Sequence, residues 1–342
     1  MDDIIKLLSA IGEEVEDAEE ESFVLFSQEI PSSNLGFVDS KASSIDLTIH
    51  SHEYTIHQSP TLLSSSRAGG TTGAVLWKIT PLFASWLSNT ASNPLWTNGY
   101  LTSSSMVVEL GCGISALTAL TMAPLLEPGS GRAGGHYLAT DQEYVHKLFR
   151  QNLVSNPPRS SKKLKGASRG SGGKKQQKFS AGDAADDGNP HPSITFTSLD
   201  WETDIPDTLK SQIQSSTADH PASGTDEEED KGFDLLLSCD CIYNEALISP
   251  FVRTCAEIAR LRFPSSTSYS SSSKRERSRR PTICIIAQQQ RSPDVFEAWL
   301  RETMRHFRVW RLGDEVLENA NDNANGLGSG SGYLVHGLVL RG

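Results

Sequence analysis

Acidic residues stand at the ends of four apolar segments of the sequence, where strands are expected to finish. They are Glu109, Asp141, Asp200 and Asp240. In an open, mostly parallel sheet the carboxyl ends of the strands meet at one edge, and ligands bind there. Carboxylates at this edge can accept hydrogen bonds from hydroxyl groups or hold a positive charge. The pattern therefore predicts one ligand site built from four strand ends.

A glycine turn lies at the centre of this predicted site. The apolar run Met106–Leu110 predicts a buried strand, Gly111 and Gly113 predict a tight turn, and a helix is expected over 115–126. A strand, a glycine turn and a helix together hold nucleoside-containing cofactors in doubly wound folds. Ser115 stands where a dinucleotide fingerprint has its third glycine. The turn therefore favours a ligand with a nucleoside and without phosphates over a dinucleotide.

Strand and helix patterns alternate along most of the chain. A period-two pattern over 45–57 predicts a β-hairpin, and apolar spacing from Leu76 onward predicts a helix. Five strand–helix repeats then lead to a closing pair of strands at 307–312 and 333–340. This order predicts an α/β fold: a doubly wound, seven-stranded, Rossmann-like sheet with an N-terminal β-hairpin.

Composition sets the domain limits. Hydrophobic residues make up 37% of 342 residues, mean hydropathy is −0.35 and the net charge is −11. We expect an acidic N-terminal tail over 1–43 and one domain over 44–342. Low-complexity insertions are predicted at about 159–192, 212–231, 264–280 and 318–332. The first insertion is basic over 159–178, which permits nuclear import or RNA contact, although a solvated insertion is the favoured interpretation.

The cysteines and the N-terminus indicate the compartment. Five cysteines lie in apolar runs without zinc-site spacing, so we expect buried free thiols, a reducing compartment and no metal. No apolar run reaches membrane-spanning length, and the N-terminus has no signal-peptide pattern. The expectation is a soluble monomer with no membrane partner, in the cytoplasm, with the nucleus as the alternative.

These motifs together resemble those of seven-β-strand S-adenosylmethionine-dependent methyltransferases. The stretch from Thr72 to Trp77 and the Asp240–Tyr243 motif are similar to the methyltransferase-like 21 group of protein-lysine methyltransferases, and within it to fungal enzymes acting on ribosomal proteins. The resemblance implies S-adenosylmethionine as cofactor and roles for eleven residues. Its cofactor-binding residues are Trp77, Glu109, Gly111, Cys112, Gly113, Asp141, Asp200, Trp201 and Cys239, and its catalytic residues are Asp240 and Tyr243.

The resemblance also implies individual roles. Glu109 orients the amino group of the cofactor, Asp141 accepts its ribose hydroxyls, and Asp200 and Trp201 flank its adenine. Asp240 is expected to hold the entering lysine ammonium, and Tyr243 to form the wall of its channel. The implied substrate is a protein, and a basic ribosomal protein suits the acidic chain.

Three alternatives remain at this point. A nucleic-acid methyltransferase uses the same fold, but the 240–243 motif lacks the two prolines usual in enzymes that methylate base amino groups. A non-catalytic scaffold with the same fold is the second alternative, and an oxidoreductase the third.

Overall fold

The computed structural model describes residues 1–30, 35–67, 70–127, 134–158, 189–214, 232–262, 280–317, 326–328 and 330–342. Most of the four predicted low-complexity insertions, including the basic stretch 159–178, lies outside the described residues. The described residues build the sheet, its covering helices and the predicted site.

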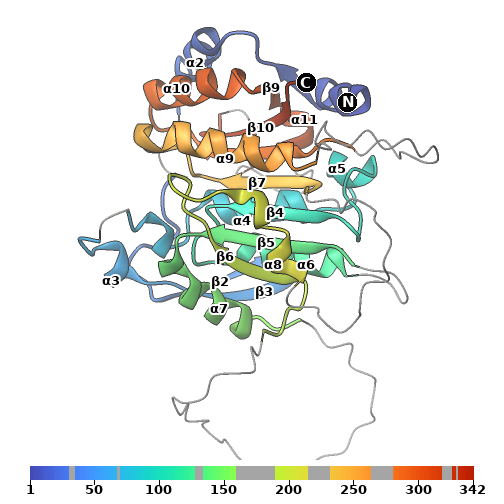
Figure 1. Cartoon of the computed structure of the whole chain (residues 1–342). Helices are drawn as coiled ribbons and strands as arrows, with labels where there is room; N and C mark the ends of the chain where they lie inside the picture. The colour runs from blue at the N-terminus through green and yellow to red at the C-terminus, as the bar shows by residue number, and fades with distance from the viewer. Residues whose placement is uncertain are drawn as a thin grey trace, which may run out of the picture.

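One large sheet organises the molecule (Figure 1). Its strands follow the order β1-β9-β10-β8-β7-β4-β5-β6. Neighbours from β8 to β6 are parallel, whereas β10 is antiparallel to both β8 and β9. The strands are β1 (Gly12–Glu14), β4 (Met106–Leu110), β5 (His136–Asp141), β6 (Ile194–Ser198), β7 (Leu235–Cys239), β8 (Ile283–Gln289), β9 (Phe307–Leu312) and β10 (Tyr333–Leu340).

The direction of winding reverses between β4 and β7, which are neighbours in the sheet but not in the chain. Ligands of doubly wound folds bind at such a switch point, outside the carboxyl ends of the strands. The predicted doubly wound α/β fold is confirmed. The described sheet has eight strands where seven were predicted, because residues 12–14 add β1 beside β9.

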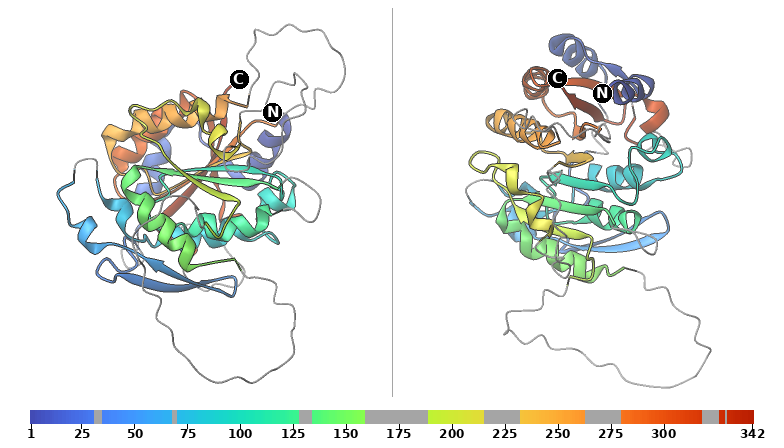
Figure 2. Two further views of the ribbon diagram at one scale, coloured as in Figure 1. Left: turned by 60° about the horizontal axis from the view of Figure 1, so that its bottom comes forward. Right: turned by 45° about the vertical axis from the view of Figure 1, so that its right-hand side comes forward.

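Helices cover both faces of the sheet (Figure 2). One face carries α1 (Asp2–Ile11), α4 (Ile79–Ser88), α6 (Leu117–Leu126) and α7 (His146–Ser155); the other carries α2 (Ala18–Phe26), α9 (Ile248–Arg260) and α10 (Pro293–Met304). Side chains alternate along each strand, so Val107 packs on the first face and Val108 on the second. Fully burying one large aliphatic side chain stabilises the fold by about 1.5–3 kcal/mol.

Shorter elements complete the chain. They are the helices α3 (Pro60–Leu63), α5 (Pro94–Thr97), α8 (Ser211–Gln214) and α11 (Asp314–Leu317), and the 3₁₀ turns η2 (Thr72–Ala74), η3 (Glu143–Val145), η4 (Pro206–Thr208) and η5 (Glu245–Leu247). Two predicted helices begin later than expected. The helix predicted over 115–126 begins at Leu117, because Ala116 has a left-handed φ of 55°, and the one predicted from 142 begins at His146, after η3.

The predicted hairpin is present as β2 (Ser44–Ile49) and β3 (His52–His57). It lies beside α7 (Figure 2), where two asparagine side chains hydrogen-bond the backbone of β3. Asn156 bonds both backbone groups of Thr55, and Asn152 bonds both of His57. Because Asn152 also donates to the Ile114 carbonyl at 2.7 Å, it connects the hairpin to the loop after the glycine turn.

The N-terminal segment differs from the predicted solvated tail. Ile4 and Leu8 of α1 are buried in the core, β1 pairs with β9, and Phe26 of α2 packs against Phe296 of α10. Residues 35–38 lie beside 76–78, with a β-bridge between Phe37 and Trp77. The apolar residues of 1–43 therefore belong to the same folded unit as the sheet.

Candidate functional site

The glycine turn after β4 has the geometry that the sequence predicts. Gly111 and Gly113 have φ values of +70° and +60°, a region that residues with a Cβ rarely adopt. A Cβ on Gly111 would lie 2.3 Å from Cys241 Sγ and 3.4 Å from a ring atom of Trp201. Close packing and backbone conformation therefore both require glycine at position 111.

A cavity opens over this turn at the carboxyl ends of β4, β5, β6 and β7. It contains about 990 Å³ of empty space, counting the solvent at its mouth. All eleven residues of the predicted site line it: Trp77, Glu109, Gly111, Cys112, Gly113, Asp141, Asp200, Trp201, Cys239, Asp240 and Tyr243. The structure thus brings the whole predicted set together at the switch point, while their individual roles stay predictions.

Two carboxyl groups in the cavity are withdrawn from water, Glu109 almost completely and Asp141 in part. Glu109 is buried and accepts a hydrogen bond from Tyr137 Oη at 2.9 Å. Burial raises the pKa of Glu109 to about 7. Asp141 accepts the backbone N–H groups of Gly113 at 2.8 Å and Gln142 at 2.7 Å, and burial raises its pKa to about 6. A positively charged or hydroxyl-bearing ligand would favour the ionised form of both groups.

Trp77 is fixed from several directions. Its Nε1 donates to the Thr72 carbonyl at 3.0 Å. The Phe37 ring lies 4.2 Å from the Trp77 ring, centroid to centroid, and the Arg291 guanidinium lies 4.6 Å from the Trp77 ring centroid. A cation over the face of an indole is attracted to its π electrons. Trp77 is therefore held in one orientation at the wall of the cavity.

Asp240 is buried and forms an ion pair. Its two carboxylate oxygens accept from Arg291 Nη1 and Nη2, each at 2.6 Å, and Oδ1 also accepts the Gln289 N–H at 3.2 Å. The Asp240 backbone has a left-handed φ of 63°. A fork of two parallel N–H···O bonds is the strongest arrangement between arginine and a carboxylate.

Tyr243 lies at the mouth of the cavity. Its side chain is 40% exposed, and its hydroxyl oxygen accepts from Thr72 Oγ1 at 3.2 Å. Partial burial raises the pKa of the Tyr243 phenol, so it stays protonated near neutral pH. The contact with Thr72 joins the loop after β7 to the loop before α4.

The loop after β6 forms the opposite wall. The Asp200 carboxylate is exposed and accepts the Glu202 N–H at 2.9 Å, which stabilises its own turn. The Trp201 ring packs edge-on against Phe251, and Arg253 donates to the Trp201 carbonyl at 2.6 Å. Trp201 Nε1 is buried without a hydrogen-bond partner among the described residues. Its indole is thus positioned by its surroundings and keeps a free donor.

Several residues of the site were not predicted. Gln289 ends β8 and Arg291 follows it, Phe37 precedes the hairpin, and Tyr144 packs on the turn at Gly73. The run Gln288–Arg291 stands after a predicted strand, at the same sheet edge as the acidic residues. The position of this run after a predicted strand was therefore the sequence signal that could have identified Arg291 as a residue near the site.

The fold and the cavity together define a class of protein. A glycine turn at the β4/β7 switch point and acidic residues after neighbouring parallel strands are the features of a Rossmann-like fold of the seven-β-strand methyltransferase type. Among the described residues, no group of three or more His, Cys, Asp or Glu side chains is placed to hold a metal ion. Within those same ranges, the helices are too short or too polar to cross a membrane.

Sequence comparison identifies fungal relatives. Ribosomal lysine N-methyltransferase 5 of Candida glabrata is 29% identical over 235 residues, covering 62% of each chain. The protein of the same name from Vanderwaltozyma polyspora is 24% identical over 324 residues, covering 84% of this chain and 88% of that one. The predicted resemblance to these lysine methyltransferases is confirmed. No protein-family model matches the sequence.

Two further likenesses are partial or distant. A diaminohydroxyphosphoribosylamino-pyrimidine deaminase of Schizosaccharomyces pombe is 34% identical over 143 residues, covering 42% of this chain. The chain spans 32% of that protein and 62% of the C. glabrata protein. A CurJ carbon methyltransferase structure superposes with a TM-score of 0.37 at 10% identity, covering 75% of this chain and 55% of that one. A likeness at that score is too low to bear on function.

Proposed function

We propose that the protein is an S-adenosylmethionine-dependent protein-lysine N-methyltransferase whose substrate is a basic protein of the large ribosomal subunit. The observation that carries this proposal is the gathering of all eleven predicted site residues around one cavity. The relatives named ribosomal lysine N-methyltransferase 5 support the same reaction and the same substrate class.

The cavity fits the cofactor by its chemistry. Gly111 lets the turn pack closely against Cys241 and Trp201 at the cavity wall, and the buried Glu109 carboxylate suits a cationic amino group. Asp141 accepts two backbone N–H groups, and its oxygens keep further lone pairs for ribose hydroxyls. Trp201 offers a ring face and a free Nε1 donor for an adenine. The remaining proposed cofactor contacts are Trp77, Cys112, Gly113, Asp200 and Cys239.

The chain's part in the reaction is to position the amine. Bound S-adenosylmethionine supplies a methyl group on a sulfonium, which is strongly electrophilic. A lysine amine is protonated near pH 7, so it must lose a proton before it can react. Alignment of the neutral amine then supplies much of the rate. Tyr243, at the mouth and fixed by Thr72, would guide the side chain inward.

The acidic net charge of the chain supports a basic substrate. The chain carries a net charge of −11, which attracts a basic partner and increases its rate of association. Ribosomal proteins are the proposed partners because of the named relatives.

The proposal is tested with methyl-labelled S-adenosylmethionine and extracted ribosomal proteins. Wild type should label one large-subunit protein, and Asp141→Ala should bind the cofactor about tenfold to a hundredfold more weakly, as expected for hydrogen bonds to a charged group. Asp3→Ala, which removes an exposed carboxylate on α1, is the control and should behave as wild type. Label in RNA would support the nucleic-acid alternative, and cofactor binding without label in any fraction would support a scaffold.

A further inference from the structure

Arg291 has two partners in the site and connects them. Its guanidinium donates two bonds of 2.6 Å to the Asp240 carboxylate, and its Cζ atom lies 4.6 Å from the Trp77 ring centroid. Asp240 follows β7 and Trp77 precedes α4, so the two residues come from segments far apart in the sequence. Arg291 therefore connects the carboxyl end of β7 to the segment before α4 that lines the cavity.

A second group of contacts supports the same link. Gln289 Oε1 accepts from Arg291 Nη2 at 3.3 Å and from the Gly36 N–H at 2.9 Å. Gly36 in turn accepts the Lys78 N–H at 2.9 Å, next to Trp77. The segment 36–37 lies outside the domain predicted over 44–342. It connects Gln289 to residues 76–78, which include Trp77. Arg291 is therefore held by Asp240 and Trp77 and also by Gln289.

The ion pair also changes what Asp240 can do. The Asp240 side chain is 3% exposed and its charge is balanced by Arg291. Three N–H groups already bind its two oxygens. An ammonium that approached this pair would meet a guanidinium beside the carboxylate, and like charges in contact repel. The pair therefore favours an amine that arrives without its proton.

The backbone at Asp240 depends on the same pair. A left-handed φ is unfavourable at most residues other than glycine, and Asp240 has φ 63°. Its N–H donates to the Ala287 carbonyl at 2.7 Å. The carboxylate fork holds the residue in this conformation, and the turn that results leads the chain to Tyr243. Arg291 thus also determines where Tyr243 stands.

We propose that Arg291 is a positioning residue that joins Asp240 to Trp77, and that Asp240 acts as the fixed half of this ion pair and not as the acceptor of the substrate's proton. The inference rests on the proposed methyltransferase function. It assigns Asp240 a role different from the one that the sequence predicts.

The decisive experiment is the pH profile of kcat/KM for Asp240→Asn. An asparagine oxygen still accepts from Arg291 but cannot take up a proton. We expect a profile of wild-type shape and a loss of at most about tenfold, the cost of about one weakened hydrogen bond. A loss of about a thousandfold, or disappearance of the acidic limb of the profile, would overturn the inference.

Arg291→Met supplies the complementary measurement. It leaves Asp240 buried without a counter-charge, so we expect kcat to fall by about a hundredfold, corresponding to nearly 3 kcal/mol. KM for the protein substrate should change little. The double variant Asp240→Asn/Arg291→Met should recover at least about fivefold over Arg291→Met, because the two residues act as a unit. Losses that multiply in the double variant would contradict the inference.

The matched control is Arg308→Met. Arg308 likewise donates two bonds to one carboxylate, that of Glu14, and lies 4.9 Å from the ring centroid of Trp310. Neither Glu14 nor Trp310 lines the cavity, whereas Asp240 and Trp77, the partners of Arg291, both do. The loss of Arg308 should leave kcat unchanged. Cofactor affinity by calorimetry and thermal unfolding are measured for every variant. Failure of wild type to bind the cofactor would refute the proposed function, whereas cofactor binding with an altered Asp240→Asn profile refutes the inference alone. If Arg291→Met does not fold, the Asp240→Asn profile decides.

Discussion

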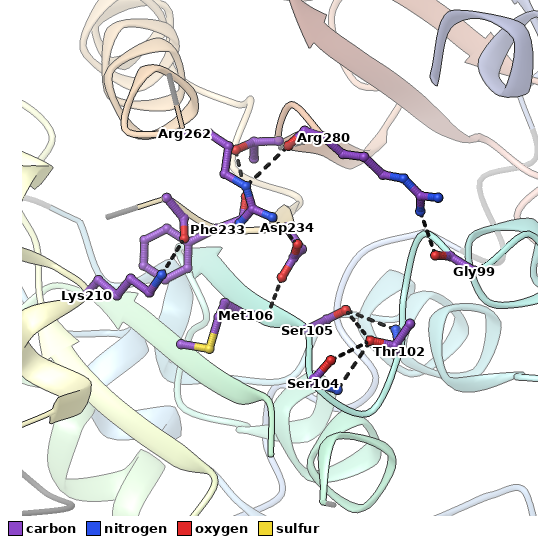
Figure 3. Close-up of polar contacts among 12 residues, drawn as sticks. Gly99, Thr102, Ser104, Ser105, Met106, Lys210, Phe233, Asp234, Arg262 and Arg280 are labelled. Atoms are coloured by element: carbon purple, nitrogen blue, oxygen red, sulfur yellow. Dashed lines mark hydrogen bonds and ion pairs between the residues drawn. The ribbon is translucent and has the colours of Figure 1, made fainter. Parts of the chain in front are cut away.

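The strand β7 is flanked by an aspartate–arginine pair at each end, and the two pairs serve different purposes. At the amino end Asp234 pairs with Arg262 and accepts the Met106 N–H at 2.7 Å (Figure 3). At the carboxyl end Asp240 pairs with Arg291. The first pair bonds mainly to backbone groups, and neither residue lines the cavity, whereas Asp240 does. The same type of ion pair therefore connects backbone segments at the amino end of β7 and contributes to the cavity at the carboxyl end.

The networks around the two pairs differ accordingly. At the amino end Arg262 also donates to the Arg280 carbonyl at 3.2 Å, and Arg280 donates to the Gly99 carbonyl at 2.7 Å (Figure 3). These bonds join the connection between α9 and β8 to the loop after α5. At the carboxyl end the pair extends instead to an aromatic ring, Trp77, at the cavity wall. Ion pairs of this kind therefore have to be interpreted from their neighbours and not from their type.

The largest expected effect comes from the glycine turn at the carboxyl end. In Gly111→Ala the new Cβ would lie 2.3 Å from Cys241 Sγ at a left-handed φ. We expect cofactor binding to weaken by at least about a hundredfold, because both strain and a clash displace the turn. The control is Gly99→Ala, at φ +67° with nothing within 4 Å of its Cβ, which isolates the strain of about 1 kcal/mol. Similar cofactor affinity in the two variants would contradict the assignment of the turn to the ligand.

The next effect separates the two ion pairs directly. Asp234→Ala should lower the free energy of unfolding by about 3 kcal/mol, since it removes the ion pair with Arg262 and the acceptor of the Met106 N–H. Its cofactor affinity should stay within about twofold of wild type. A twofold change corresponds to less than half of the 1.4 kcal/mol of binding free energy that a tenfold change represents. Asp240→Ala should cause a similar loss of stability together with a large loss of turnover. Urea unfolding and calorimetry measure the two quantities, and a loss of cofactor affinity in Asp234→Ala would break the distinction.

The smallest effect is a pH dependence confined to the carboxyl end. Burial raises the pKa of Glu109 from 4.5 to about 7 and that of Asp141 from 3.8 to about 6. Between their unfolded and folded pKa values these two groups bind more protons in the folded chain, so their contribution to the free energy of unfolding should fall as pH rises from about 4 to about 7 and then level off. Burial lowers the pKa of His136 to about 4 and that of His336 to about 3, so these two groups contribute in the opposite direction over part of the same range. The free energy of unfolding of wild type minus that of Glu109→Gln should therefore fall over this interval. Cofactor affinity should increase over the same range, because a cationic ligand favours the ionised carboxyl groups. A difference between wild type and Glu109→Gln that rose over this interval would contradict the assignment of burial as the dominant cause.

The sequence was informative about this end of the sheet because parallel strands must bring their carboxyl ends together. Glu109, Asp141 and Asp240 could be placed at one edge from strand patterns alone, and each lines the cavity. Arg291 could not be paired with Asp240 in this way, because 51 residues separate them and strand periodicity does not specify the partner of a loop residue. The bonds from Asn152 and Asn156 to β3 are equally invisible, since an asparagine on a helix usually faces solvent.

The N-terminal segment shows a different limit of sequence reasoning. The acidic run that predicted a solvated tail contains Glu13 and Glu14, which pair with Arg311 and Arg308 of β9. Such charges are compatible with an edge strand that has partners on its neighbour, and composition alone cannot reveal those partners. Ala116 is a similar case, because its left-handed φ depends on the packing of the glycine turn and not on helix propensity.

The bonds at the amino end of the sheet also have a consequence for how the chain can change in length. In four connections a hydrogen bond joins a residue near the end of the preceding helix to one near the start of the next strand. The bonds are Gly135 N–H to the Leu126 carbonyl, the His191 ring to the Asn156 carbonyl, Lys210 to the Gly232 carbonyl, and Arg262 to the Arg280 carbonyl. All four lie between a helix and the next strand, opposite the cavity. Chain closure there costs only about 0.6 kcal/mol for each doubling of loop length. This edge can therefore gain or lose sequence during evolution, or accept an inserted reporter domain, while the chemistry at the other edge is preserved.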